Sequence, residues 1–143
     1  MPHEDCIFCK IIHGEIPSAK VYEDEHVYAF LDISQVTKGH TLVIPKQHVR
    51  NIYDTPADVA KELFARIPKI ANAIKAAYQP VGINIVNNNE APAGQTVFHL
   101  HIHLIPKYEA GKGYEPLWET HTDEYSQNDL QEIATHIQKQ IKE

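Results

Sequence analysis

Hydrophobic and polar residues alternate most regularly in residues 97–106, which read VFHLHIHLIP. Every second residue from 99 to 103 is a histidine, and apolar residues fill the positions between them. Alternate side chains of a β-strand point to opposite faces, whereas a helix would scatter the histidines around its circumference. The pattern therefore predicts a strand over 97–106 that carries His99, His101 and His103 on one face, about 6.5 Å apart.

The remaining pattern predicts further strands and three helices. Apolar residues spaced by three and four predict one long helix over 56–78. Thr55 is expected to cap this helix, and Pro68 to bend it. Shorter helices are expected over 6–12, capped by Asp5, and over about 128–142. Short runs rich in branched apolar residues predict strands at 20–22, 26–33, 40–45 and 83–87.

These elements indicate an α+β fold built on a single antiparallel sheet, with short helices at the N and C termini. We expect the apolar face of the histidine strand to pack on the long helix, because both faces are apolar and must be buried. The imidazoles would then lie on the solvent side of the sheet.

A chain of 143 residues fits one domain with a buried core. Its formal net charge of −6 argues against nonspecific binding to nucleic acid, which needs a basic surface. No apolar run approaches the roughly 20 residues of a membrane span, and the acidic N-terminal segment does not resemble a signal peptide. We therefore expect a cytoplasmic protein whose two cysteines, Cys6 and Cys9, are reduced.

A row of imidazoles beside the polar loop 88–94 suits a phosphate ester as ligand. A neutral histidine can attack phosphorus while neighbouring donors stabilise the phosphate oxygens. A second interpretation stays open, because two histidines separated by one strand residue can hold zinc with a third ligand from elsewhere. The residues alone favour phosphoryl or nucleotidyl transfer over a metal site.

Four blocks of the sequence resemble the histidine triad (HIT) family. Residues 94–106, GQTVFHLHIHLIP, are similar to the family signature of alternating histidines and apolar residues preceded by Gly-Gln. The blocks CIFCKI (6–11), FLDIS (30–34) and GHTLVIPKQH (39–48) precede it in the family's order. The chain looks most like the Hint branch in its small bacterial form. The resemblance implies a HIT-like fold, one HIT domain over 1–143 with 109–143 as a variable C-terminal extension, and a homodimer.

The resemblance also implies a nucleotide-binding hydrolase or transferase. Its substrates would be nucleoside phosphoramidates or related nucleoside-monophosphate adducts, with purine nucleotides preferred. At matching positions, His101 would be the nucleophile that carries the nucleotidyl group, His103 would contact the phosphate, and His99 would orient the site. His40 matches a fourth histidine of the same pocket. The alternatives are a dinucleoside polyphosphate hydrolase, a nucleotide-binding regulatory protein with little turnover, and a zinc module without catalysis.

Several residues match nucleotide contacts of the family. Asp32 would hold the ribose hydroxyls, and Asn88 would lie at the phosphate. Ile33 and Phe8 would pack on the base, although an ordinary core position explains these two equally well. Gln95 and Thr96 belong to the loop that contacts the phosphate and the leaving group. The full expected set is Phe8, Asp32, Ile33, Asn88, Gly94, Gln95, Thr96 and Val97.

A zinc site occurs in part of the family, and Cys6, Cys9, His48 and His99 match its ligands. Two thiolates and two imidazoles make a sensible tetrahedral structural site. A reduced C-x-x-C pair without metal, beside a surface histidine, is the alternative interpretation.

Two positions depart from the family's pattern. Glu90 stands where many relatives have glycine, and its carboxylate is expected either to repel a ligand phosphate or to point to solvent. Gln35 stands where a proline is often found, and this replacement is expected to loosen its loop.

Overall fold

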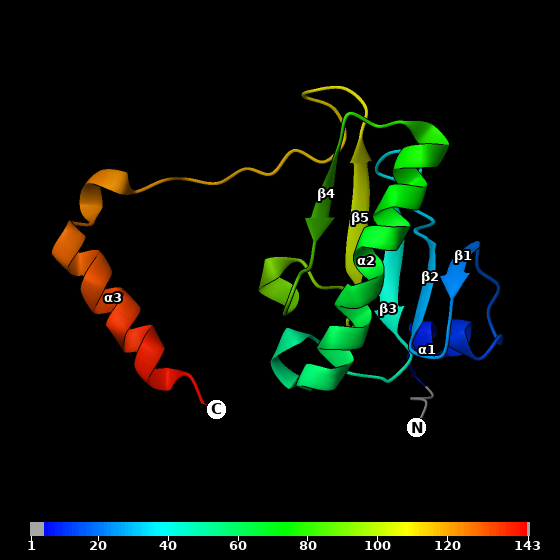
Figure 1. The fold of residues 1–143 in the computed structure, drawn as a ribbon, viewed down its shortest axis with the longest axis horizontal. Coiled ribbons are helices and arrows are strands. Elements are labelled where there is room, and N and C mark those ends of the chain that lie inside the picture. Colours follow the sequence, from blue (N-terminus) through cyan, green and yellow to red (C-terminus); the bar gives the residue numbers. More distant parts are fainter. Residues whose placement is uncertain (1–4, 143) are drawn as a thin grey trace.

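The computed structural model describes residues 5–142, and its centre is one antiparallel sheet of five strands (Figure 1). The strands lie in the order β1–β2–β3–β5–β4, and every neighbouring pair is antiparallel. This arrangement confirms the predicted α+β fold class. The strands are β1 Lys20–Glu23, β2 Val27–Leu31, β3 Thr41–Pro45, β4 Gly82–Val86 and β5 Ile102–Lys107. The helices are α1 Ile7–Ile12, α2 Ala57–Tyr78 and α3 Gln127–Gln140, with short 3-10 turns at Ile52–Asp54, Ala91–Ala93 and Thr122–Glu124.

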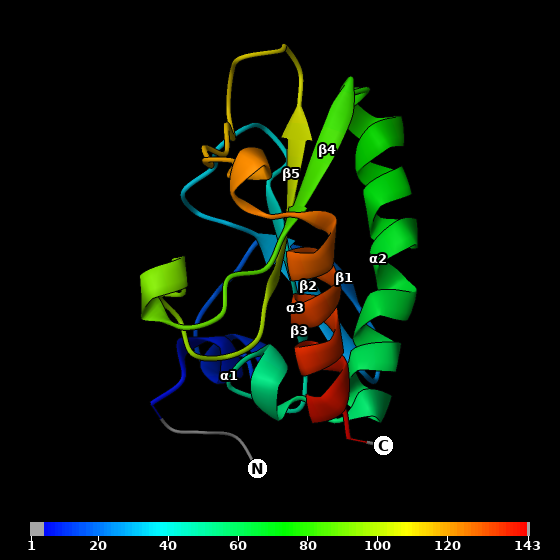
Figure 2. The ribbon, with the colours of Figure 1, turned by 90° about the vertical axis from the view of Figure 1, so that its left-hand side faces the viewer.

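Helix α2 covers one face of the sheet and builds the main core (Figure 2). Its buried positions recur at steps of three and four, as the amphipathic pattern predicts. They meet the apolar residues that alternate with the histidines, so the predicted packing of the histidine segment on the long helix is confirmed. The buried residues of this core are Val27, Ala29, Val43, Val49, Leu63, Ile67, Ile70, Ile74, Leu100, Ile102 and Leu104.

Helix α1 covers part of the opposite face (Figure 2). Phe8 and Ile11 pack there against the outward residues of β2 and β3. Because β3 is covered on both faces, all five of its residues are buried. This second layer is the reason why the triad does not face open solvent.

The helix starts differ from their predicted caps. Cys6, not Asp5, caps α1, since its sulfur accepts from the main-chain N–H of Cys9 at 3.3 Å. The residue before α2 is Pro56, and Thr55 instead donates its hydroxyl hydrogen to the carbonyl of Asn51. Helix α2 continues through Pro68 to Tyr78 without interruption.

The histidine segment forms a shorter strand than predicted. Ladder pairing with β3 and β4 begins at Ile102, so residues 97–101 are outside β5. Upstream of Ile102, Leu100 donates its main-chain N–H to the carbonyl of Val49, which lies beyond the end of β3. The predicted solvent side is wrong for two of the three imidazoles: His99 is fully buried, and His101 is 6% exposed.

The chain beyond β5 leaves the body of the molecule and ends in α3, which stands apart from the sheet (Figure 1). Ser126 caps α3 in a reciprocal capping box with Asp129. The apolar residues of this helix remain exposed, between 44% and 60% at Leu130, Ile133 and Ile137. Within residues 5–142, no helix combines the length and the apolar character that a membrane crossing requires.

Candidate functional site

A cavity of about 760 Å³ opens where α1, β2 and the loop before β5 meet. One part of its wall is apolar and comes from α1 and the segment that follows it. The other part is polar and carries His101 and His103. The lining residues are Ile7, Phe8, Ile11, Ile16, Pro17, Ser18, Ala19, Phe30, Leu31, Asp32, Ile33, Gln35, Leu42, Asn88, Gly94, Thr96, Val97, His101 and His103.

The ring of His101 is held in one tautomer by the main chain. Its Nδ1 lies 2.8 Å from the carbonyl oxygen of His99, which can only accept a hydrogen bond. Nδ1 therefore carries the proton, and Nε2 keeps its lone pair. Phe8 packs against the ring edge-on, with ring centroids 5.2 Å apart. This arrangement suits a nucleophile, because the attacking nitrogen is unprotonated and the ring is fixed.

A second chain of hydrogen bonds fixes His103 in the opposite tautomer. The main-chain N–H of Val36 donates to Nδ1 of His40 at 3.2 Å, so the proton of a neutral His40 is on Nε2. That Nε2 lies 2.9 Å from Nδ1 of His103 and donates to it. The remaining proton of His103 is therefore on Nε2, where it can be donated to a ligand.

Burial keeps this group of imidazoles neutral. Loss of hydration lowers the pKa of His101, and it also lowers the pKa of His40. Burial and the neighbouring rings of His101 and His40 lower the pKa of His103 to about 4. At neutral pH the site thus holds an imidazole lone pair beside an imidazole N–H donor, and the rings of His101 and His103 are 5.1 Å apart.

Asp32 brings a carboxylate to the same cavity. Its Oδ2 lies 3.6 Å from Nε2 of His40, while Oδ1 accepts from the main-chain N–H of Ser34. Gln35 closes the following loop rather than loosening it as predicted. Its amide donates to the carbonyls of Asp32 and His40 and accepts from the main chain of Gly39.

The two predicted base-packing residues differ in environment. Ile33 is fully exposed at the rim of the cavity, whereas Phe8 is 6% exposed and belongs to the α1 core. Phe8 therefore lines the cavity and also stabilises the fold, and Ile33 contributes nothing to the core.

The loop before β5 supplies polar groups at the cavity. Gly94 has a φ of +104°, and a β-carbon there would lie 3.4 Å from the amide nitrogen of Asn88. Asn88, Thr96 and Val97 line the cavity. Gln95 does not, because its side chain is buried and bonded to Asn51, Glu90 and two carbonyls. Glu90 also turns away from the cavity, to Arg50 and Asn51.

The four predicted metal ligands lie close together, and one of them, His99, also belongs to the triad. One donor atom from each of Cys6, Cys9, His48 and His99 lies within 4.8 Å of all the others. Nε2 of His99 is 2.8 Å from the carbonyl of Pro45, so Nδ1 faces the two sulfurs at 3.4 and 3.6 Å. Two sulfur and two nitrogen donors in this arrangement fit a tetrahedral zinc ion. Both cysteines are free. A reduced pair without metal would also be free, so the state of the thiols does not distinguish the two interpretations.

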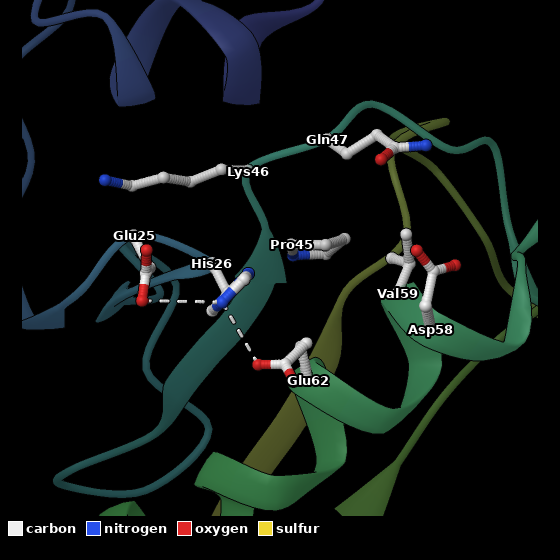
Figure 3. A pocket seen from close by; sticks show the side chains of 8 residues that line it. All are labelled: Glu25, His26, Pro45, Lys46, Gln47, Asp58, Val59 and Glu62. Atoms are coloured by element: carbon white, nitrogen blue, oxygen red, sulfur yellow. Dashed lines mark ion pairs between the residues drawn. The ribbon is translucent and has the colours of Figure 1, made fainter.

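A different hollow lies on the surface between the first turns of α2 and the adjoining ends of β2 and β3 (Figure 3). Its volume is about 310 Å³, and its wall is rich in acidic groups. His26 lies between Glu25 and Glu62 there, at 3.6 and 3.2 Å. The carboxylates would repel a phosphate, so this hollow is not a candidate nucleotide site.

Three residues that support the site are not among those predicted from the sequence. Arg50 and Asn51 contact the loop before the triad across about forty residues of sequence, and Val36 acts through its main chain. No residue type or spacing in the sequence marks these three positions.

Comparisons with known proteins agree with this site. The profile of the HIT domain matches residues 13–110. "Protein hit" of Bacillus subtilis is 59% identical over 96% of this chain and 95% of its own length. Adenosine 5'-monophosphoramidase HNT1 of Candida albicans is 38% identical over 81% of this chain and 79% of its own length. Adenylylsulfatase HINT3 of Arabidopsis thaliana is 45% identical over 73% of this chain and 53% of that protein.

Solved structures extend the agreement to the fold. A HIT family protein from Bacillus subtilis is 58% identical and superposes with a TM-score of 0.95, covering 98% of this chain and 99% of that one. A zinc-bound histidine triad family protein from Mycobacterium smegmatis is 33% identical, with a TM-score of 0.73 over 92% of this chain and 97% of that one. The domain match covers more than half of the sequence and includes the whole triad, and the chain therefore belongs to the HIT family.

Proposed function

We propose that this protein cleaves nucleoside phosphoramidates, or related adducts of a nucleoside monophosphate, through a nucleotidyl group carried on His101. The observation that supports this most directly is the pair of fixed tautomers. His101 presents a lone pair at Nε2, and His103 presents a proton at Nε2, in the same cavity.

The reaction has two displacements at phosphorus. In the first, Nε2 of His101 forms a bond to the phosphorus, and the bond from phosphorus to the leaving nitrogen breaks. The leaving nitrogen accepts a hydrogen bond from Nε2 of His103, takes a proton from solvent water and departs as the amine. In the second, water attacks the phosphorus, its proton passes to solvent, and the bond to His101 breaks to release the nucleoside monophosphate. Positioning and charge stabilisation provide most of the catalysis in such transfers.

We assign the other nucleotide contacts to residues that line the cavity. Asp32 holds the ribose hydroxyls, and Asn88 and Thr96 donate to the phosphate oxygens. Phe8 and Ile33 pack on the base, with Val97 and Gly94 completing the wall near the phosphate. These assignments are supported by the lining of the cavity. We assign Gln95 to the support of the loop, because its side-chain amide already makes four hydrogen bonds.

The names of two relatives bear on the group that is transferred. One relative is an adenosine 5'-monophosphoramidase and another an adenylylsulfatase, and both names describe an adenylyl group joined to a small leaving group. We therefore propose adenosine monophosphate as the transferred part and, because the family resemblance implies purine nucleotides, guanosine monophosphate as the other candidate. A dinucleoside polyphosphate is the alternative substrate.

The test is hydrolysis of adenosine and guanosine phosphoramidates and of dinucleoside polyphosphates by the wild-type chain and by His101→Ala. His136→Ala, an exposed histidine on α3, is the matched control. We expect the wild type and the control to release the monophosphate, and His101→Ala to lose at least about a thousandfold in kcat while still binding AMP. Full turnover by His101→Ala would overturn the assignment. AMP binding without turnover by the wild type would instead favour a regulatory nucleotide-binding protein.

We further propose that Cys6, Cys9, His48 and His99 hold a structural zinc ion. The donor set and the zinc-bound relative support this. The ion would stabilise the contact between α1 and the triad. Elemental analysis of the purified protein tests the proposal, and less than about a tenth of an equivalent of zinc would contradict it.

A homodimer and a cytoplasmic location complete the proposal. The exposed apolar face of α3 supports a second copy as its partner, because isolated helices rarely leave such a face in water. Free cysteines support a reducing compartment. We keep 109–143 as a variable extension; the ends of the proposed domain, 1–4 and 143, are outside the described residues.

A further inference from the structure

Glu90 carries backbone strain in the loop before the triad. Its φ of 80° and ψ of 150° form a conformation that glycine adopts easily and other residues adopt rarely. Such strain persists only where surrounding contacts impose the conformation. The contacts of Glu90 therefore show what holds this loop.

The carboxylate of Glu90 is bound from two sides. Its Oε2 accepts from the guanidinium of Arg50 and, at 3.1 Å, from the side-chain amide of Asn51. Arg50 is fixed in turn, since its guanidinium lies 4.7 Å from the ring centroid of Phe98 and its main-chain N–H donates to Asp54. Asn51 is 1% exposed. The strained residue is thus anchored to the segment that follows β3.

The main chain of Glu90 closes the turn in which Gly94 lies. Its N–H donates to Oε1 of Gln95 at 2.9 Å, and its carbonyl accepts from the main-chain N–H of Gln95 at 3.2 Å. Oε1 of Gln95 also accepts from Asn51 at 3.1 Å. The two ends of the turn and the segment after β3 are therefore joined in one network. Gly94, inside this turn, lies next to the side chain of Asn88, which precedes the turn.

We infer that Glu90 and Arg50 form a positioning pair that holds the turn 90–95 in the geometry that binds a nucleotide phosphate. The identity of the ligand rests on the proposed function. Neither side chain lines the cavity, so the pair acts through Asn88, Gly94 and Thr96. Both side chains are partly exposed, Arg50 at 47% and Glu90 at 41%, and an exposed ion pair contributes little to global stability. The ion pair therefore acts mainly on the conformation of the turn 90–95.

A purely electrostatic effect of the two charges predicts a different change in phosphate affinity. If the two charges acted on the phosphate only through space, removal of Glu90 would strengthen binding of an anion, and removal of Arg50 would weaken it. A positioning pair predicts weaker binding in both cases. The sign of the change at Glu90 separates the two explanations.

Two substitutions of Glu90 separate the effect of its backbone strain from the effect of its contact with Arg50. Glu90→Ala removes the carboxylate and keeps a side chain in the strained conformation, whereas Glu90→Gly removes both the carboxylate and the strain. Glu90→Gly should therefore unfold at a higher temperature than Glu90→Ala, while both lose the contact to Arg50 equally.

The experiment measures AMP affinity by calorimetry, KM and kcat for an adenosine phosphoramidate, and the melting temperature. The variants are Glu90→Ala, Glu90→Gly, Arg50→Ala and Arg50→Ala/Glu90→Gly. We expect each to raise the AMP Kd and KM by about three- to tenfold with kcat within about twofold, and the double variant to be no weaker than either parent. Glu23→Ala is the control, because Glu23 also pairs with two cations, Lys20 and Lys46, away from the cavity.

Tighter AMP binding by both Glu90 variants, or a Kd that follows the melting temperature across the series, would overturn the inference. An unchanged Kd in Glu90→Gly would do the same. The AMP measurement does not need turnover. A wild type that binds AMP but hydrolyses no phosphoramidate would therefore contradict the proposed function and still decide the role of Glu90.

Discussion

The carbonyl oxygen of His99 accepts the Nδ1 hydrogen of His101 at 2.8 Å. The ring of the same His99 faces the sulfurs of Cys6 and Cys9. One residue therefore contributes its side chain to the candidate metal site and its main chain to the orientation of the candidate nucleophile. Any change that moves the His99 ring should move the carbonyl that holds His101.

Loss of the metal ligands should lower kcat more than it changes KM. In Cys9→Ser, zinc content should fall and kcat should drop by about tenfold, a typical effect of disturbing the outer shell of a site. KM should change less, because Asp32, Asn88 and Thr96, which are assigned to the ribose and the phosphate, lie on segments without metal ligands. The measurements are zinc stoichiometry and steady-state kinetics. Wild type stripped by a chelator should behave like Cys9→Ser and recover when zinc is added. An unchanged kcat after complete metal removal would contradict the coupling.

The spacing of apolar residues predicts much of the fold, because these residues recur at regular intervals in most helices and strands. The stripe Val59, Leu63, Ile67, Ile70 and Ile74 can be buried only by a helix on an apolar sheet face. Alternation in the triad segment likewise separates imidazoles from core residues. Boundaries were less predictable, since Ile102 is where β5 begins only because the neighbouring strands pair there.

The surroundings of the triad depended on contacts that a single sequence does not encode locally. His99 and His101 are buried because α1, distant in the chain, packs its Phe8 on both rings. The predicted cap of α1 is wrong for a similar reason: Asp5 is the better capping residue by type, but Cys6 occupies the cap position and bonds to Cys9. The prediction for Gln35 is wrong because its three hydrogen bonds reach main-chain atoms of a loop that only the fold closes.

The acid limb of the pH profile should lie below the usual pKa of histidine. Burial lowers the pKa of His101, and an attacking imidazole must be neutral. Activity is therefore retained as pH falls through about 6.5 and is lost only as His101 becomes protonated at lower pH. The measurement is kcat/KM for a phosphoramidate between pH 4 and 8. An acid midpoint at or above pH 6.5 would contradict the burial argument.

Stability should fall over the same acidic range. The folded pKa of His103 is about 4, below the unfolded value, so the unfolded chain binds more protons between those two pH values. Acidification from about pH 6.5 to 4 should therefore destabilise the fold, by up to about 1.4 kcal/mol per pH unit for such a histidine. Denaturant unfolding of the wild type and of His103→Gln at several pH values measures the free energy of unfolding. This free energy should depend less steeply on pH in the variant. Equal slopes would count against a buried neutral His103.

Gly94→Ala should impair ligand binding more than folding. A side chain at φ +104° costs about 1–2 kcal/mol, and its β-carbon would lie in van der Waals contact with Asn88, 3.4 Å from the amide nitrogen. We expect KM to rise roughly fivefold or more, since small displacements of binding groups have large kinetic effects. Gly111→Ala is the matched control, with a φ of +83° and no atom within 4 Å of the added carbon. A similar KM increase in Gly111→Ala would show that the effect does not come from contact with Asn88.

A charge on the apolar face of α3 should dissociate the proposed homodimer. Leu130, Ile133 and Ile137 recur on one face of the helix and stay between 44% and 60% exposed in the single chain. In Ile137→Asp a carboxylate would have to be buried in the interface without a partner, which should weaken dimerisation by about a hundredfold. Gln131→Asp places the same charge on the polar flank of α3 and should leave the dimer intact. Sedimentation over a concentration series measures the dissociation constant for wild type and both variants. A monomeric wild type at high protein concentration, or equal weakening in both variants, would argue that α3 does not bind a second copy.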